Sequence, residues 1–453
     1  MQKSLLVGCG AGFSGDRLDA AGPVVQTLIS RGQPAALIFE NLAERTLAFA
    51  HIAKSNDSTQ GFEPLLAMEL EPVLADCLAH GIAIVGNFGA ANPEGAARCI
   101  FQLAQRLGVP PPRIALVTGD DVAPDDGIPE LDDLFAHSVD RRRFVSANAY
   151  QGAFPIAEAL RAGAQIVVTG RVADPALTLG PAIAHFGWTE NDFDQLAGGS
   201  IAGHLLECGS QVTGGYFSDP GKKDVPGMDQ LGFPIAEIQA DGSCTIFKAD
   251  RTGGLVSLRT VKEQLIYEIH DPASFLTPDV VVDITQVDLA EAGPDAVRVS
   301  GARGMPRPAR LKTNVYYDDG WLGEAEISYS GCNAEARARL SMDVIRKRMN
   351  GALAMRFDLI GAISIMGDDS GQLMLDTPTG GALDVRLRVA SAHHDLEMVD
   401  RMLREVNALY NNGPAGGGGV RLSKRRRVSM KTIFVRRELL PAQFQFFVPG
   451  EPS

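Results

Sequence analysis

The sequence predicts an α/β fold in which helices flank a mostly parallel sheet, built either as a doubly wound open sheet or as a barrel. Short apolar runs alternate with longer amphipathic runs through the first half of the 453-residue chain, and turns rich in Gly, Asn or Asp join them. Glycine follows the last periodic residue of three expected helices, at Gly32, Gly81 and Gly108, where a left-handed cap is needed. This alternation is typical of βαβ units and fits both architectures.

The short runs of this half predict strands, and the amphipathic runs between them predict helices. The expected strands are 5–7, 35–39, 82–85, 114–117, 144–146 and 165–168. The expected helices are 24–31, 65–80, 94–107, 155–162 and 176–186. Because the carboxyl ends of parallel strands meet at one edge, we expect the turns that follow them to line the ligand site.

The pattern changes near residue 243, so we expect three domains: a parallel α/β domain over 1–242, an α+β two-layer domain over 243–368, and a small tail over 369–453. In the second domain we expect strands over 244–248, 280–283, 296–300, 312–317 and 324–330, with helices over 261–269 and 334–349. In the tail, strand 384–389, helix 396–410 and a strand over 428–435 predict a βαβ-like unit, with a glycine-rich loop over 411–419.

Composition excludes several classes of partner. The formal net charge of -13 argues against nucleic acid or an anionic membrane, because binding to either relies on positive surface charge. No apolar run reaches the roughly 18 residues of a membrane span, and the first residues lack the features of a signal peptide. Six cysteines without a CxxC pair fit neither a secreted disulfide framework nor a zinc ribbon. We therefore expect a cytoplasmic protein with reduced thiols and no cofactor.

A glycine-rich turn, 8–17, directly follows the first expected strand. Glycines let backbone N–H groups approach an anion closely, so we expect Gly10, Gly12 and Ser14 to contact a phosphate or carboxylate, with charge added by Arg17. The spacing matches neither the Walker motif nor GxGxxG. A tight turn with a purely structural role is the alternative.

Polar side chains also follow later strands. Glu40 comes directly after a buried strand and is a candidate general base, with helix capping as the rival role. Asn87 and Asn148 follow two further strands, and we expect them to orient the substrate. Asn92 precedes Pro93, which predicts a helix N-cap instead of a ligand contact.

The turn after the sixth strand, 169–175, combines an arginine with an aspartate. The planar guanidinium of Arg171 suits a carboxylate or phosphate, and Asp174 could orient it or move a proton. A structural ion pair between these two residues is the alternative.

His204 and Glu207 have the i, i+3 spacing that puts both side chains on one helical face. They could form a base with its orienting group, or two ligands of a metal. The sequence shows no third ligand, so we expect no metal, and a packed or capping histidine is the further alternative. Cys9 and Cys208 are expected to be buried small side chains and not nucleophiles.

Taken together and in this order, these turns resemble the acyclic terpene utilisation AtuA family. The matching stretches are 8–17, 39–46, 86–93, 169–177, 203–217 and 252–272. The third turn departs from the family's usual Asn-Ala-Gly-Gly at Phe88, Ala90 and Ala91. The resemblance implies a role in breaking down branched acids through acyl-CoA intermediates. It also implies a small ferredoxin-like domain, which the tail resembles.

We therefore expect an enzyme, a lyase or isomerase, that acts on a branched carboxylate or acyl-CoA by proton transfer next to a carbonyl, in hydration, dehydration or isomerisation. Glu40, Asp174 or His204 would move the proton, and Arg171 with the 8–15 turn would hold the anionic substrate. The alternative is a non-catalytic subunit that binds an acyl-CoA or a partner enzyme.

We also expect a homo-oligomer. The strands of the second half leave at least one sheet edge open, and exposed edges are normally covered or paired. The basic run 424–427 and the glycine loop would then contact an acidic surface of a second copy, so the tail would contribute to the interface. A solvated strand entry is the alternative role of the basic run.

Overall fold

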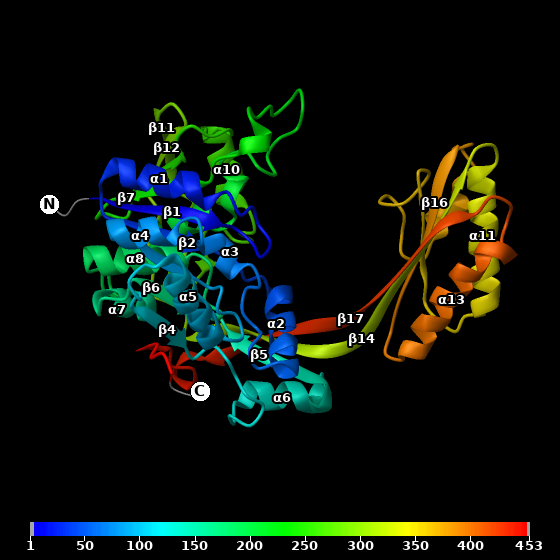
Figure 1. Ribbon diagram of the computed structural model, residues 1–453, viewed down its shortest axis with the longest axis horizontal. Helices are drawn as coiled ribbons and strands as arrows, with labels where there is room; N and C mark the ends of the chain where they lie inside the picture. The colour runs from blue at the N-terminus through cyan, green and yellow to red at the C-terminus, as the bar shows by residue number, and fades with distance from the viewer. Residues whose placement is uncertain (1–3, 451–453) are drawn as a thin grey trace. The chain divides into compact units, whose positions relative to one another are not determined.

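The computed structural model describes residues 4–450, in which strands and helices are joined by turns and loops (Figure 1). The strands are β1 Leu5–Ala11, β2 Ala35–Phe39, β3 Ala83–Gly86, β4 Ile114–Thr118, β5 Phe144–Ala149, β6 Ile166–Thr169, β7 Pro234–Ile238, β8 Cys244–Lys248, β9 Phe275–Leu276, β10 Val281–Asp283, β11 Asp288–Gly293, β12 Ala296–Ser300, β13 Arg303–Met305, β14 Arg310–Ser330, β15 Arg356–Ile360, β16 Asp384–His393, β17 Gly418–Arg436 and β18 Gln443–Phe446. The helices are α1 Ala21–Arg31, α2 Glu44–Asn56, α3 Leu66–Leu70, α4 Leu74–His80, α5 Pro93–Leu107, α6 Pro129–His137, α7 Phe154–Arg161, α8 Ala176–Phe186, α9 Phe193–Glu207, α10 Leu258–Ile266, α11 Ala334–Met349, α12 Gln372–Asp376 and α13 Leu396–Asn412.

The chain forms two compact units. Unit 1 holds the described residues of 1–138, 145–315 and 431–453, and unit 2 holds 139–144 and 316–430. Apart from the short segment 139–144, the chain passes from unit 1 into unit 2 within β14 and returns within β17.

Unit 1 is built on a sheet that has ten strands in the described part of the chain, in the order β11-β12-β8-β7-β1-β2-β3-β6-β4-β18. The five strands β1, β2, β3, β6 and β4 pair in parallel. Antiparallel strands extend this centre on both sides, because β7, β8, β12 and β11 follow one another as antiparallel neighbours and β18 pairs antiparallel with β4. The expectation of a mostly parallel sheet is therefore wrong: the sheet is mixed.

The sheet is open, and helices cover both of its faces. β11 and β18 end the strand order, which settles the choice between a doubly wound sheet and a barrel in favour of the open sheet. Helices α1, α3, α4 and α5 pack on one another in one layer, and α7, α8 and α9 form a second layer. Both faces of the central strands are covered, so β2 and β6 are apolar and almost entirely buried.

Two elements of this half differ from their expected form. The expected helix 65–80 is two helices, because Pro72 lies between α3 and α4 and lacks the N–H that a continuous helix needs. The expected strand at 144–146 exists as β5, but it pairs with β14 and lies outside the ten-stranded sheet. The expected N-cap is confirmed, since the Asn92 side chain accepts a hydrogen bond from the Gly95 N–H at 3.0 Å.

Unit 2 consists of strands in the order β15-β16-β14-β17, with α11 and α13 packed on one face. Along the chain these elements follow as strand, helix, strand, strand, helix, strand. Side chains of β14 alternate, so that Ile327 and Tyr329 join the apolar core under the helices while Glu324 and Glu326 face the other side. The two strands expected over 312–317 and 324–330 form one continuous strand that passes through Gly320.

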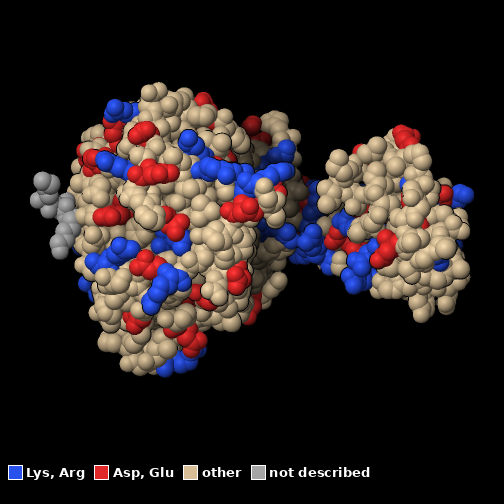
Figure 2. Space-filling model, turned by 90° about the horizontal axis from the view of Figure 1, so that it is seen from above, with Lys and Arg blue, Asp and Glu red and all other residues tan. Residues whose placement is uncertain are grey.

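Acidic and basic side chains are interspersed on the face shown in Figure 2. Within unit 2, three of the four residues of the basic run 424–427 pair with nearby carboxylates. Lys424 pairs with Asp400 at 2.8 Å, Arg427 pairs with Asp319 at 3.0 Å, and Arg426 pairs with Asp318. None of the helices within residues 4–450 combines the length and apolar character that a membrane crossing requires.

Close packing between α8 and α9 predicts the effect of a methyl group at Gly203. An added Cβ there would lie 2.6 Å from the Pro175 carbonyl oxygen and 2.7 Å from the Pro175 Cα atom. We expect Gly203→Ala to lower the free energy of unfolding by about 1–3 kcal/mol, because the helices must separate. The control is Gly22→Ala in α1, where an added Cβ meets nothing within 4 Å. This change should raise the free energy of unfolding by up to about 1 kcal/mol. Urea unfolding that finds Gly203→Ala as stable as the wild type contradicts this packing.

Candidate functional site

The strand order of unit 1 creates a crevice between β3 and β6. After β3 the chain enters α5 in one helix layer, and after β6 it enters α8 in the other layer. Neighbouring strands whose connections leave to opposite faces open a crevice at their carboxyl ends, where ligands of open α/β sheets bind. The two turns touch at this point, since a Cβ on Gly89 would lie 2.5 Å from the Thr169 carbonyl oxygen.

A cavity of about 570 Å³ opens beside the turn after β6, and we call it the Asp174 cavity. Its polar lining residues are Glu44, Tyr150, Asp174, His204, Glu207, Glu268, Thr277, Arg310 and Lys312. Its apolar lining residues are Ala173, Pro175, Phe275, Leu276, Pro278, Pro308, Ala309, Leu311 and Phe434. An apolar wall with a few convergent charged groups is typical of small-molecule sites.

Arg171 lies beneath this cavity with 1% of its side chain exposed. Its guanidinium donates to the carbonyl oxygens of Leu42 and Val172 and to the Asp174 carboxylate. It also stacks over the Tyr150 ring, with 4.5 Å between the guanidinium carbon and the ring centroid. Burial disfavours the charge, yet Asp174 and Tyr150 raise the pKa of Arg171 above its ordinary value. Because its N–H donors bond to protein acceptors, Arg171 holds the turns after β2 and β6 together and has few donors left for an anionic ligand.

Asp174 lines the cavity and remains 35% exposed. Its Oδ1 atom accepts from Arg171, which fixes the carboxylate in place. Burial raises the pKa of Asp174, and the Arg171 charge opposes that rise. A fixed and accessible carboxylate whose proton affinity is increased suits acid–base chemistry.

Tyr150 links Arg171 to the cavity rim. Its hydroxyl donates to Glu44 Oε1 at 2.6 Å, and the Lys312 ammonium lies 4.5 Å from the ring centroid on a second cation–π contact. Lys312 Nζ is 3.4 Å from Glu44 Oε1 and is 43% exposed at the cavity. The ring is thus held by two cations, and Lys312 keeps donor capacity for a ligand.

Glu40 and Asn87 form a buried network at the ends of β2 and β3. Glu40 Oε1 accepts from the Leu42 N–H at 2.8 Å and from Asn87 Nδ2 at 2.9 Å, and Asn87 Oδ1 accepts from the Asn41 N–H at 2.7 Å. Burial, assisted by the nearby Asp174 charge, raises the pKa of Glu40 to about 8. Neither Glu40 nor Asn87 is among the residues that line the Asp174 cavity within the described chain.

Asn148 helps to hold the turn after β6 in place. Its Nδ2 donates to Asp120 Oδ2 at 3.1 Å, and the same oxygen accepts the Arg171 backbone N–H at 2.8 Å. Burial raises the pKa of Asp120 to about 6. Asn148 therefore supports the turn that carries Arg171 and does not line the cavity in the described part of the chain.

His204 and Glu207 form a buried pair on α9, at the cavity wall. His204 Nε2 lies 3.0 Å from the Gln264 carbonyl oxygen, which can only accept, so Nε2 carries a proton. His204 Nδ1 lies 2.9 Å from Glu207 Oε1, which places one proton between these two atoms. Burial raises the pKa of Glu207 to about 7, and its Oε2 has no hydrogen-bond partner among the described residues. Both nitrogens of His204 are therefore engaged, whereas Glu207 keeps one buried oxygen without a partner among the described residues.

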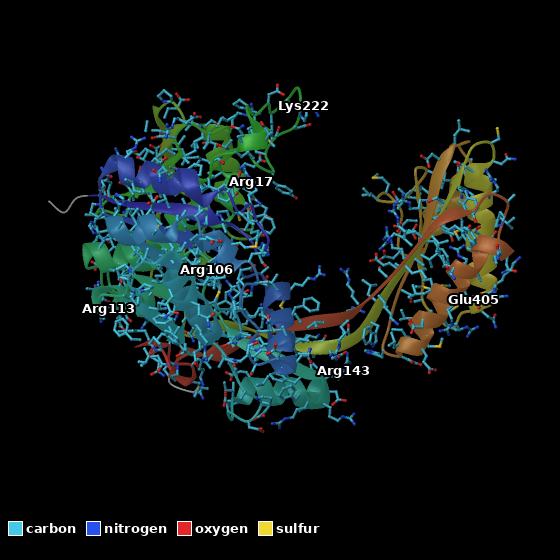
Figure 3. All side chains as sticks on the ribbon, in the orientation of Figure 1. Arg17, Arg106, Arg113, Arg143, Lys222 and Glu405 are labelled. Atoms are coloured by element: carbon cyan, nitrogen blue, oxygen red, sulfur yellow. The ribbon has the colours of Figure 1, made fainter. Side chains whose placement is uncertain are left out.

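In the glycine-rich turn after β1, backbone N–H groups bind a carboxylate of the same turn. Asp16 accepts hydrogen bonds from the Gly12 N–H at 2.9 Å and the Arg17 N–H at 2.8 Å. Arg17, labelled in Figure 3, pairs with Asp19 and donates to the Leu231 carbonyl oxygen at 3.0 Å. A Cβ on Gly12 would lie 2.4 Å from the Gly209 nitrogen, so that glycine permits close packing against the end of α9.

The remaining residues of that turn lie elsewhere. A Cβ on Gly10 would lie 2.7 Å from the Phe39 ring. Ser14 lines a different cavity of about 470 Å³ beside α2. None of Gly10, Gly12, Ser14 and Arg17 lines the Asp174 cavity in the described chain.

The structure thus joins Glu40, Asn87 and Asn148 to the supports of Arg171, and brings Asp174 and His204 to one cavity. Sequence reasoning missed Glu44, Lys312 and Glu268 as lining residues. Glu44 follows the β2 turn and Glu268 lies in a stretch that matches the family, so each had a sequence signal. Lys312 had none, because only β14 brings it near the turns. Within residues 4–450, no group of three or more His, Cys, Asp or Glu is arranged to hold a metal ion.

The raised pKa of Glu40 predicts a pH dependence of stability. A carboxyl with a raised folded-state pKa stabilises the fold fully below its unfolded pKa of about 4.5, and loses that contribution as pH rises through about 8. Glu40→Gln keeps the acceptor for Leu42 and Asn87 without ionising. We expect it to be more stable than the wild type at pH 9 by at least about 1 kcal/mol, and nearly equal at pH 5. Urea unfolding at both pH values measures this, and equal pH dependence in the two proteins contradicts it.

Comparison with known proteins adds a family to this geometry. The family model described as acyclic terpene utilisation family protein AtuA matches residues 5–446, nearly the whole chain. A search of curated proteins finds no match. The described units and the Asp174 cavity fall almost entirely within the matched range. The chain belongs to the acyclic terpene utilisation family AtuA.

Proposed function

We propose that this protein is an enzyme that moves a proton next to the carbonyl group of a branched carboxylate or acyl-CoA, in a hydration, dehydration or isomerisation. The observation that carries the proposal is Asp174, which is anchored by Arg171 and 35% exposed at a largely apolar cavity. A general base or acid must be fixed and reachable, and its pKa must approach the working pH. Asp174 is fixed and reachable, and burial raises its pKa in the direction that this chemistry needs.

The surrounding groups support this chemistry. The Glu207 and His204 pair, with a Glu207 pKa of about 7, supplies a second proton-exchanging group at the same cavity. The apolar wall of Phe275, Leu276 and Phe434 suits a branched hydrocarbon chain. Family membership ties the chain to the utilisation of acyclic terpenes, whose carbon skeletons are branched.

For binding the anion we propose a different cation from the one that the sequence favoured. Arg171 has its donors on Leu42, Val172 and Asp174, so a substrate anion would have to break those contacts. Lys312 lies at the cavity and is 43% exposed. Lys312 is therefore the residue that we propose for binding the substrate's negative charge.

The arrangement of unit 2 supports two further parts of this proposal. Its order of strand, helix, strand, strand, helix, strand is that of ferredoxin-like folds, so we infer a ferredoxin-like unit that begins at β14. β17 lies at the end of the strand order and is largely exposed, which supports a homo-oligomer in which this edge is covered.

Turnover by Asp174→Asn tests the proposal. The assay offers purified protein branched 3-hydroxyacyl-CoA and 2-enoyl-CoA thioesters and the corresponding free acids, with products followed by mass spectrometry. We expect Asp174→Asn to lower kcat by about 10²- to 10⁴-fold, because the amide cannot exchange a proton. The control is Asp132→Asn, an exposed carboxylate on α6, which should leave kcat unchanged.

Two results would count against the enzyme. Tight binding of a thioester by the wild type without turnover would favour a non-catalytic acyl-CoA-binding subunit. Full activity in Asp174→Asn would remove Asp174 from the chemistry.

A further inference from the structure

Glu268 lies two residues beyond the end of α10 and lines the Asp174 cavity with an exposed side chain. Contacts with α9 fix the helix that carries it. The Gln264 carbonyl oxygen accepts from His204 Nε2 at 3.0 Å, and Gln264 Nε2 donates to the His204 carbonyl oxygen at 3.4 Å. At its other end α10 begins with a capping box between Ser257 and Thr260. Glu268 is therefore presented to the cavity by a helix that is fixed at both ends.

The position is unfavourable for a glutamate in two ways. Its φ of 60° lies in the left-handed region, where a side chain with a Cβ is strained and glycine is not. A carboxylate just beyond a helix C-terminus also meets the negative end of the helix dipole. A glycine here would remove both the backbone strain and the repulsion by the helix dipole. Neither the backbone conformation nor the helix therefore explains why this residue is a glutamate.

Strain alone does not mark a functional residue in this chain, because Arg251 and Asp295 also have positive φ angles. The surroundings distinguish Glu268. Its charge interacts with Asp174 and with Glu207, and it helps to raise the pKa of both carboxyls. Four carboxyl groups, those of Glu44, Asp174, Glu207 and Glu268, therefore share one cavity. Like charges in one site disfavour ionisation of all of them together.

We propose that Glu268 is a catalytic residue that activates water for addition to an α,β-unsaturated acyl substrate, with Asp174 as its acid partner. This inference rests on the proposed function and selects hydration of a 2-enoyl thioester within it. Glu268 is exposed, whereas Glu44 and Asp174 at the same cavity are half-buried and paired with Lys312 and Arg171. Water therefore reaches Glu268 most readily.

The step balances without a further reactant. The Glu268 carboxylate takes one proton from water, and the water oxygen forms a bond to C3 of the substrate. The electron pair of the C2–C3 double bond moves to C2, which takes the proton from the Asp174 carboxylic acid. The product is the 3-hydroxyacyl thioester, and transfer of the proton from Glu268 to Asp174 through solvent restores both groups.

Three variants separate this role from a structural one, with 3-methylbut-2-enoyl-coenzyme A as the probe. Glu268→Gln keeps the strain and removes the base, so we expect wild-type stability and a hydration rate lowered about 100-fold. Glu268→Gly removes the strain as well as the base, so we expect a higher urea midpoint and the same loss of the hydration rate. The control is Arg251→Gly, which relieves strain at an exposed residue outside the Asp174 cavity and should raise the urea midpoint with an unchanged rate.

A second readout distinguishes failure of this inference from failure of the proposed function. In D₂O, exchange of the C2 protons of the 3-hydroxyacyl thioester requires Asp174 alone, and NMR follows it directly. We expect exchange to persist in Glu268→Gln and to stop in Asp174→Asn. Full hydration by Glu268→Gln, with Asp174→Asn inactive, overturns only the role of Glu268. Absence of both hydration and exchange in the wild type overturns the proposed function and this inference together.

Discussion

The buried guanidinium of Arg171 is the contact on which the candidate site depends. A charge with 1% of its side chain exposed is tolerated only when its donors are paired, and those of Arg171 bond to Leu42, Val172 and Asp174. Through these bonds Arg171 joins the turn after β2 to the turn after β6, and its stacking on Tyr150 adds the end of β5. The position of Asp174 at the cavity is a direct consequence.

Burial then determines the acid–base properties around this centre. Desolvation is the largest influence on Glu40, Asp174 and Glu207, and it raises the pKa of each. These three carboxyls differ in their access to the cavity. Glu40 is enclosed by Leu42 and Asn87, whereas Asp174 and Glu207 line the cavity. The same physical effect therefore gives a stabilising carboxyl in one place and, in our proposal, proton-exchanging carboxyls in the other.

The sequence predicted those parts of the fold that local patterns determine. Strand 35–39 and helix 176–186 agree with β2 and α8 at both ends, because apolar periodicity and the glycine after α8 define them. Pairings between distant segments were not predictable, and the antiparallel extensions of the sheet and the β5–β14 pair are of this kind. At the site, the turns after strands were found from their polar residues. That Arg171 would bond to Leu42, or that Lys312 would stack on Tyr150, depends on contacts that no spacing records.

The most direct test of this account is the equilibrium stability of Arg171→Lys without substrate. A lysine cannot reproduce the planar set of donors, so we expect Arg171→Lys to lower the free energy of unfolding by about 2–4 kcal/mol. The loss is smaller than for a fully buried ion pair because Asp174 keeps access to water. The control is Arg98→Lys on α5, an exposed residue that should change the free energy of unfolding by less than about 0.5 kcal/mol. If Arg171→Lys unfolds at the wild-type urea midpoint and only substrate binding weakens, Arg171 is a substrate ligand and the account is contradicted.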